Sequence, residues 1–438
     1  MDGFILLVVG SLLFLLLGFA LENGSSDAMA DFGVVYFPAR CLAAHGDPYS
    51  PAAVSRFYGA NKGDPHWTDP KNREFVTHNE YPPTAFTLIA PFAMLPWGAA
   101  HLLWIGLTAA GLMLAAFLTW ELCSAVVPVL SAVLIAFLLA NCEALIVLGN
   151  PAGLAISLCV IAVWCFLRDR FAVIGAICMA AGLALKAHDT GLIWLCLLLT
   201  GGVYRKRALQ TLSAVAVISL PSVVWVWLVS PHWMTELHAN VTRFLVHGGT
   251  SDPGPASSGS HGLDMLVNLQ AVVSVFRDDP RFYQLISLGV SGALLLVWSI
   301  LTARSRPSAE RLALSIAAAS ALSVLPFYHH VHDAKLILLA VPGCMALVAQ
   351  GGRMGRAALG VTAIAFVCTG DLIWAIALSL VHKIPPPASW LGKQFVIAVQ
   401  VFPASLAILG LGVFYLCALA RDSREVDLEE HEFAPASR

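Results

Sequence analysis

The chain alternates between long apolar runs and short polar turns over almost its whole length. Its first run, residues 4–21, contains no charged residue and is long enough to cross a bilayer as a helix. Eleven further apolar runs follow, at about 99–119, 123–141, 150–167, 171–187, 188–203, 208–229, 282–302, 308–326, 333–350, 357–380 and 395–419. The pattern therefore predicts an all-α polytopic membrane protein with about twelve transmembrane helices.

Two long polar segments, about 22–98 and 230–281, interrupt this pattern. An apolar stretch inside the first, residues 84–95, is too short to cross and contains Pro91, so we expect a re-entrant or interfacial element there. The short turns on the opposite side carry Arg168, Arg170, Arg205, Lys206, Arg207, Arg304, Arg306, Arg353, Arg356 and Arg421. The positive-inside rule makes that side cytoplasmic, which places both termini inside and both long loops outside, in the plasma (inner) membrane.

The N-terminal run has a second interpretation as a signal peptide, because Ala28-Met-Ala30 resembles a cleavage site. The start Met-Asp-Gly carries no positive charge, which favours a retained span. We expect one membrane bundle over residues 1–421 and a disordered acidic tail over 422–438.

Composition agrees with the membrane interpretation. Only 12% of residues are charged, whereas soluble proteins average about 25%, and the mean hydropathy is +0.78. The net charge of −2 and the lack of a basic stripe argue against nucleic-acid binding. Most of the ten cysteines lie inside apolar runs and fit packing roles, without the spacing of a metal site or a disulfide framework.

Titratable side chains gather in the turns of the outer face, where charge near bilayer depth usually has a function. These turns carry Asn141, Glu143 and Asn150, then Lys186, His188 and Asp189, then the segment 328–333. Asp371 lies inside an expected span and should face a cavity or pair with a lysine. The Gly/Ser/Pro-rich stretch 248–262 is either a plain linker or a gate over this face.

Asp31, just beyond the first span, is the strongest candidate for a general base. It has an alternative role as the N-cap of a following helix. Asp27 and Asp47 are its nearest rivals, although Asp47 in Gly-Asp-Pro-Tyr suits a turn.

The same face carries cations and histidines that can line one polar site. Lys186 and Arg40 supply charge, and His329, His330 and His332 supply hydrogen bonds. Lys186 also fits snorkelling at a helix end, and the histidines fit interfacial polarity. A zinc site at His329, His332 and Asp333 is a third possibility that we do not favour. We expect no metal or other cofactor.

Five motifs in order along the first 200 residues resemble glycosyltransferase family 87, whose members have the GT-C fold. They are Asp31-Phe-x-Val-x-Tyr-x-x-Ala-Arg40, Gly46-Asp-Pro-Tyr49, Tyr81-Pro-Pro83 leading into Pro91-x-x-x-Leu-Pro96, Leu148-Gly-Asn150, and Ala181-Gly-Leu-Ala-Leu-Lys186. Asn150 stands where the family more often has Gln. The resemblance implies short interfacial helices in the first exterior loop, and it adds Asn150 and Tyr81 to the donor-binding candidates.

The resemblance also implies a reaction. A sugar, mannose or a related one, moves with inversion from a polyprenyl-phosphate donor to a hydroxyl of a lipid-linked or glycan acceptor, with Asp31 as the base. The aromatic residues Tyr36, Tyr49, Tyr81, Trp97 and Trp104 either stack on sugar rings or form the interfacial belt. Two other functions stay open: a GT-C enzyme with another acceptor, and a transporter or flippase of a lipid-linked sugar.

Overall fold

The structure is a computed structural model that describes residues 1–25, 28–60, 70–249, 251–254, 266–304, 308–326, 329–372, 376, 389–401 and 403–433. Every named element in these ranges is a helix. The β structure within these ranges is an isolated bridge between Leu266 and His330. Six helices are long and apolar enough to cross a membrane, and shorter apolar helices accompany them. The chain is therefore an all-α polytopic membrane protein, as its pattern predicts.

The expected spans coincide with helices. The long ones are α1 (Asp2–Glu22), α6 (Trp97–Cys123), α12 (Gly202–Val229), α15 (Pro280–Arg304), α21 (Pro403–Phe433) and the continuous pair η2 (Asp333–Leu339) and α17 (Ala340–Gln350). The shorter ones are α7 (Pro128–Leu139), α9 (Ala152–Leu167), α10 (Ala172–Leu185), α11 (Ala187–Thr200), α16 (Ala309–Leu322) and α18 (Gly352–Cys368). A further helix, α20 (Trp390–Val401), precedes α21.

Arginine ion pairs tie helix ends together at one end of the bundle. Arg207 at the start of α12 lies 2.9 Å from Asp169, which follows α9, and Arg168 lies 2.9 Å from Glu121 near the end of α6. Arg311 at the start of α16 pairs with Asp422 in α21. Since the chain reverses at each turn, the turns that hold the predicted site residues lie at the opposite ends of these helices.

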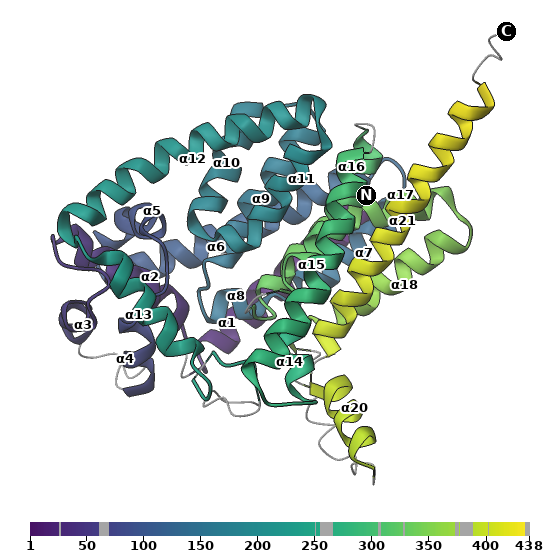
Figure 1. Cartoon of the computed structure of the whole chain (residues 1–438). Coiled ribbons are helices and arrows are strands. Elements are labelled where there is room, and N and C mark those ends of the chain that lie inside the picture. The colour runs from purple at the N-terminus through teal and green to yellow at the C-terminus, as the bar shows by residue number, and fades with distance from the viewer. Residues whose placement is uncertain are drawn as a thin grey trace.

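The first long polar segment, about 22–98, contains four short helices, α2 (Ala30–Ala43), α3 (Pro51–Ala60), α4 (Pro70–Thr77) and α5 (Pro83–Ala93). Figure 1 shows α2, α3 and α4 together with α13 (Trp233–Leu245) on one side of the bundle, with α12 along the neighbouring edge. The eleven residues of α5 span about 16 Å, roughly half of a hydrocarbon core. This helix packs against α2, α10 and α12, which fits the half-element that the sequence predicts.

Aromatic side chains form the core of this loop. Phe32 stacks on Trp104 with ring centroids 4.9 Å apart, and Phe37 stacks on Trp97 at 5.4 Å. Tyr36, Tyr49 and Trp104 have no exposed surface. Their burial fits neither sequence interpretation, sugar stacking or an interfacial belt. Tyr36 and Trp104 pack where α2 meets α6, and Tyr49 packs on Phe86 of α5 and Trp233 of α13.

The described part of the second long polar segment, about 230–281, contacts the first. The Asn240 amide of α13 donates to the backbone carbonyls of Tyr49 at 3.2 Å and Asn79 at 3.1 Å. Further along, two residues before the start of α14 (Leu269–Ser274), the amide of Val267 donates to the carbonyl of His329 at 2.8 Å. The stretch 255–262, the larger part of the proposed gate, lies outside the described residues, so the gate stays a prediction. So does the disorder of the acidic tail, into which α21 continues as far as Phe433.

Candidate active site

Asp31 lies in the first turn of α2, which is docked on the end of a short helix, α8 (Glu143–Val147). The amide of Met29 donates to the carbonyl of Val147 at 2.7 Å, and the amide of Asp31 donates to the carbonyl of Leu148 at 3.0 Å. Met29 is the N-cap of α2 and makes no side-chain cap, so the alternative role of Asp31 as an N-cap is wrong. At this position the carboxylate interacts favourably with the positive end of the helix dipole.

Asn150 connects Asp31 to the rest of the site. Its Nδ2 donates to Oδ2 of Asp31 at 2.6 Å, while its Oδ1 accepts from the amide of Ala152 at 2.8 Å and from Nζ of Lys186 at 3.3 Å. Gly149 precedes it with φ +64°, and a Cβ there would lie 2.8–2.9 Å from atoms of Met29 and Phe32. Only a glycine therefore lets this turn approach α2 so closely.

Lys186 lies between α10 and α11 with a side chain that is 6% exposed. Its ammonium donates to the carboxylate of Asp333 and lies 3.5 Å from Oδ2 of Asp189. Burial by itself lowers the pKa of Lys186, but these two carboxylates outweigh it and hold the pKa above the usual value. Lys186 is therefore an ammonium at neutral pH, held between the carboxyl groups of Asp189 and Asp333.

The three predicted histidines surround the same ion pairs. His329 is fully buried with Nε2 3.7 Å from Asp189, and Nε2 of His332 lies 3.5 Å from Asp333. His330 stacks on His332 at 5.1 Å, and its backbone amide donates to Asp333 at 3.1 Å. Burial lowers the pKa of His329 to about 4 and that of His332 well below its usual value. Both are neutral imidazoles at pH 7, which donate one N–H each but carry no charge.

Tyr81, in the first long polar segment, lies close enough to this cluster for the charges of Lys186 and Asp333 to act on it. Its amide donates to Oδ1 of Asn79 at 2.7 Å, and its carbonyl accepts from the Tyr49 hydroxyl at 2.9 Å. Burial raises the pKa of Tyr81, and the charges that act on its hydroxyl include those of Lys186 and Asp31. The phenol is therefore neutral at pH 7 and can donate a hydrogen bond.

Arg40 is the predicted residue that the structure places elsewhere. Its Nη1 donates to the Tyr36 hydroxyl at 2.5 Å and to the carbonyl of Leu95 at 3.0 Å. Nine residues along α2 separate it from Asp31, which corresponds to about 13 Å. These contacts join α2 to the turn after α5. Of the rivals to Asp31, Asp47 forms a turn by accepting from the amide of Tyr49 at 2.9 Å, and Asp27 lies outside the described residues.

A second buried ion pair supports the first. Nζ of Lys335 lies 2.7 Å from Oδ1 of Asp371 and also donates to the carbonyls of Asn141, at 2.7 Å, and Thr369. The other Asp371 oxygen accepts from the amide of Ala144 in α8 at 2.8 Å. The expectation that Asp371 faces a cavity or pairs with a lysine is met by this pair.

Together the two ion pairs close a ring of contacts. Asp31 is linked through Asn150 to Lys186, and Lys186 through Asp333 to η2. Two residues further along η2, Lys335 holds Asp371, which binds the start of α8. The end of α8 then returns to the backbone of Asp31. The position of the Asp31 carboxylate therefore depends on contacts from both halves of the chain.

Sequence reasoning did not rank Asp189, Asp333 and Glu143 as site residues. Glu143 is 1% exposed, and neither of its carboxylate oxygens has a hydrogen-bond partner in the described part of the chain. Burial, followed by the charge of Asp371, raises its pKa to about 7. All three lie in the polar turns that the sequence analysis assigned to one face. This placement was the sequence feature that could have identified them as site residues. Only the packing shows which of these groups meet.

One group of side chains has the donor types of a metal site. Ligand atoms of His188, Asp189, His329 and Asp333 lie within 4.8 Å of one another. This set differs from the zinc alternative of the sequence, because it contains His188 and Asp189 in place of His332. The ammonium of Lys186 already contacts both carboxylates and supplies the positive charge that a metal would bring.

The sequence model of glycosyltransferase family 87 matches residues 79–327, which is more than half of the chain. A search of curated proteins found no match. The matched range contains Tyr81, Asn150 and Lys186, whereas Asp31 lies before it and the histidines at 329–332 lie just beyond it.

Proposed function

The chain belongs to glycosyltransferase family 87 and is a membrane glycosyltransferase, and from this premise we propose its substrates and mechanism. The donor is a sugar, mannose or a closely related hexose, on a polyprenyl phosphate. The acceptor is a hydroxyl of a lipid-linked or glycan molecule. The observation that carries this proposal is the hydrogen bond of 2.6 Å from Asn150 to Asp31, which fixes a carboxylate beside buried donors suited to a phosphate.

Asp31 acts as the general base in the proposed reaction. Its carboxylate takes the proton of the acceptor hydroxyl while that oxygen attacks the anomeric carbon of the sugar. The bond from this carbon to the phosphate oxygen breaks on the opposite face, and polyprenyl phosphate leaves with the bonding electrons. One carboxylate is sufficient because the phosphate leaves as a stable anion. Since the acceptor oxygen attacks from the face opposite the phosphate, the product has inverted configuration.

The leaving phosphate gains negative charge and needs donors more than it needs an acid. The site offers the Tyr81 hydroxyl and the N–H groups of His330 and His332 for this task. Lys186 is committed to the carboxyl groups of Asp189 and Asp333. Lys186 therefore reaches the phosphate only by leaving one of these partners. Otherwise it positions Asn150 and Asp333.

We propose that this site faces the exterior of the plasma (inner) membrane. The arginine-rich turns lie at the other end of the helices, and positive charge favours the cytoplasmic side. Both termini are then cytoplasmic. This orientation gives the polyprenyl chain access to the site from the bilayer.

The decisive experiment compares wild type with Asp31→Asn in membranes supplied with a radiolabelled polyprenyl-phosphate sugar. Loss of the base should lower transfer by about 10²- to 10⁴-fold at equal expression. Asp47→Asn is the matched control, because it removes a carboxylate of the same loop that accepts from the amide of Tyr49. Transfer by Asp31→Asn at the wild-type rate would remove Asp31 as the base, and no transfer by wild type from any such donor would overturn the donor class.

A further inference from the structure

One face of α12 lies open over the whole length of the helix. Leu209, Val217, Leu220 and Val224 are each more than half exposed, and they follow one another along this helix. The helix lies along the outer edge of the bundle, where it packs against α5, α10 and α11 on its other side (Figure 1). With twenty-eight residues it is about 42 Å long, enough to reach from one membrane surface to the other.

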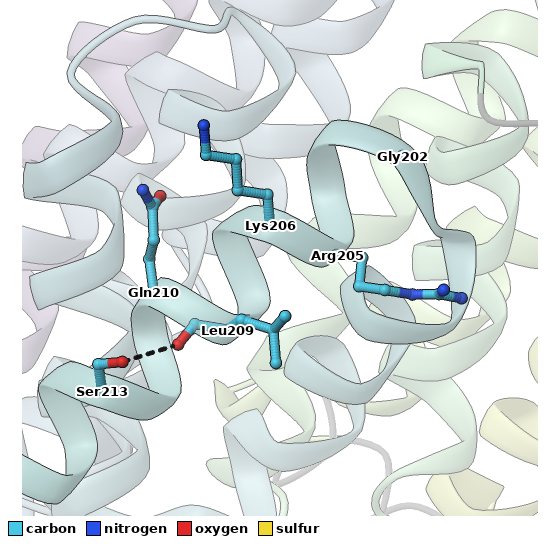
Figure 2. Close-up of a pocket in the computed structure, with 6 residues that line it drawn as sticks. All are labelled: Gly202, Arg205, Lys206, Leu209, Gln210 and Ser213. Carbon is cyan, nitrogen blue, oxygen red and sulfur yellow. Dashed lines mark hydrogen bonds between the residues drawn. The ribbon is translucent and has the colours of Figure 1, made fainter.

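The beginning of this face is a cationic hollow. Gly202, Arg205, Lys206, Leu209, Gln210 and Ser213 line a shallow cavity of about 430 Å³, and Figure 2 shows Lys206 and Gln210 projecting from neighbouring turns toward the same side. Lys206 is exposed. Arg205 uses its Nε to donate to the carbonyl of Leu198 at 3.1 Å, and Figure 2 shows its side chain pointing away from Lys206.

The charge at this end of α12 is not balanced locally. Three cations, Arg205, Lys206 and Arg207, follow one another in its first two turns. The carboxylate of Asp169 pairs with Arg207 at 2.9 Å. The positive end of the helix dipole adds to the remaining charge. An anion at the mouth of the hollow is therefore electrostatically favoured.

The chemistry changes in order along the face. The cations come first, and Gln210 and Ser213 follow one to two turns later. Gln210 accepts from Arg207 at 3.1 Å through Oε1, which leaves its amide N–H groups as donors. Beyond Ser213 the exposed side chains of α12 are all apolar as far as Leu228. A phospholipid has the same order: a phosphate, then ester carbonyls, then acyl chains.

We propose that this face of α12 is a binding site for an anionic phospholipid. The phosphate is held by Lys206, the ester region meets Gln210, and an acyl chain lies along Leu209, Val217 and Leu220. A soluble phosphate would use only the cationic end, and a zwitterionic lipid would bring its own cation to Lys206. The site lies at the end of the helices opposite to Asp31 and is independent of the transfer reaction.

The test is a lipid titration of the purified full chain, followed by native mass spectrometry. Wild type should bind phosphatidylglycerol more tightly than phosphatidylcholine of the same acyl chains. Lys206→Gln should weaken phosphatidylglycerol binding about fivefold, the effect of one cation at a membrane surface, and leave phosphatidylcholine unchanged. Lys206→Arg should bind as wild type does. Arg353→Gln, an exposed cation at the start of α18, is the matched control and should change nothing.

Three results would overturn the proposal. The first is equal binding of the two lipids by wild type. The second is unchanged phosphatidylglycerol binding by Lys206→Gln in protein that elutes as a single folded species. The third is displacement of phosphatidylglycerol by millimolar glycerol 3-phosphate, since a site that recognises the headgroup alone is a soluble-anion site.

Discussion

The side-chain amide of Asn150 donates to the carboxylate of Asp31 at 2.6 Å, although 119 positions separate the two residues in the chain. The oxygen of this amide accepts from Lys186. One short side chain therefore determines the distance between the proposed base and the buried cation. Asn150 does this from the turn that opens α9, where its Oδ1 also accepts from the amide of Ala152. We therefore propose that Asn150 positions Asp31.

Asn150→Ala should therefore lower kcat much more than it raises KM. The Asp31 carboxylate loses its orienting donor, and a misplacement of about 1 Å costs about 10²-fold in rate. The loss of the bond to Ala152 should also cost about 1 kcal/mol of stability. Steady-state transfer assays with varied donor concentration separate the two kinetic constants.

Asn150→Gln serves as the control for this prediction, because it keeps the amide donor and has the residue more common in the family. It should retain most of the wild-type kcat. An Asn150→Ala variant with wild-type kcat and a raised KM would show that this residue binds the donor instead of holding Asp31.

Removing one charge of the Lys335–Asp371 pair should destabilise the protein much more than removing both charges. Lys335→Met leaves the Asp371 carboxylate without its cation in a buried place and should destabilise the fold by about 3–5 kcal/mol. The double variant Lys335→Met/Asp371→Asn removes both charges and should regain most of that loss. Thermal unfolding of the detergent-solubilised protein measures both effects.

A matched comparison for this prediction is the exposed pair Arg243–Glu74, whose nitrogen and oxygen lie 2.5 Å apart. Its removal should change stability by less than about 1 kcal/mol, because solvent screens both charges. Equal losses of stability for Lys335→Met and Arg243→Met would mean that burial does not make the Lys335–Asp371 pair more important for stability than the exposed pair.

Glu143 should make stability depend on pH near neutrality. Its pKa is raised from the ordinary 4.5 to about 7 in the folded protein, so folding favours its protonated form. The cost of ionising it is absent below pH 4.5, grows as the pH rises, and is complete above pH 7. From these two pKa values it amounts to about 3 kcal/mol.

Glu143→Gln removes this cost, so the variant should unfold at a higher temperature than wild type at pH 8.5 and at nearly the same temperature at pH 4.5. The control is Glu310→Gln, which changes an exposed glutamate at the start of α16. A constant difference between Glu143→Gln and wild type across this pH range would show that Glu143 does not titrate there.

Hydropathy predicted where the helices lie, because about twenty apolar residues leave the backbone few alternatives in a membrane. It also placed Asp31, Asn150 and Lys186 in turns at one face. It could not pair Lys186 with Asp333 or Lys335 with Asp371, since both pairs join turns that are far apart in the chain. It placed Arg40 near the site because Arg40 follows Asp31 in sequence, but the helix of α2 carries Arg40 about 13 Å away.

Lys186 gives the last prediction, on metal dependence. If its ammonium is the cation that Asp189 and Asp333 require, transfer should persist after exhaustive treatment with EDTA. Lys186→Met should then abolish transfer, because it leaves two buried carboxylates without a cation and releases Asn150. His188→Ala distinguishes a metal site from a site that depends on the Lys186 ammonium. His188 belongs to the metal-competent group, but it takes no part in the contacts that Lys186 makes with Asn150 and Asp333. The variant should keep most of the activity. Loss of transfer on chelation, restored by Zn²⁺ or Mn²⁺ and lost again in His188→Ala, would show instead that the four side chains hold a metal.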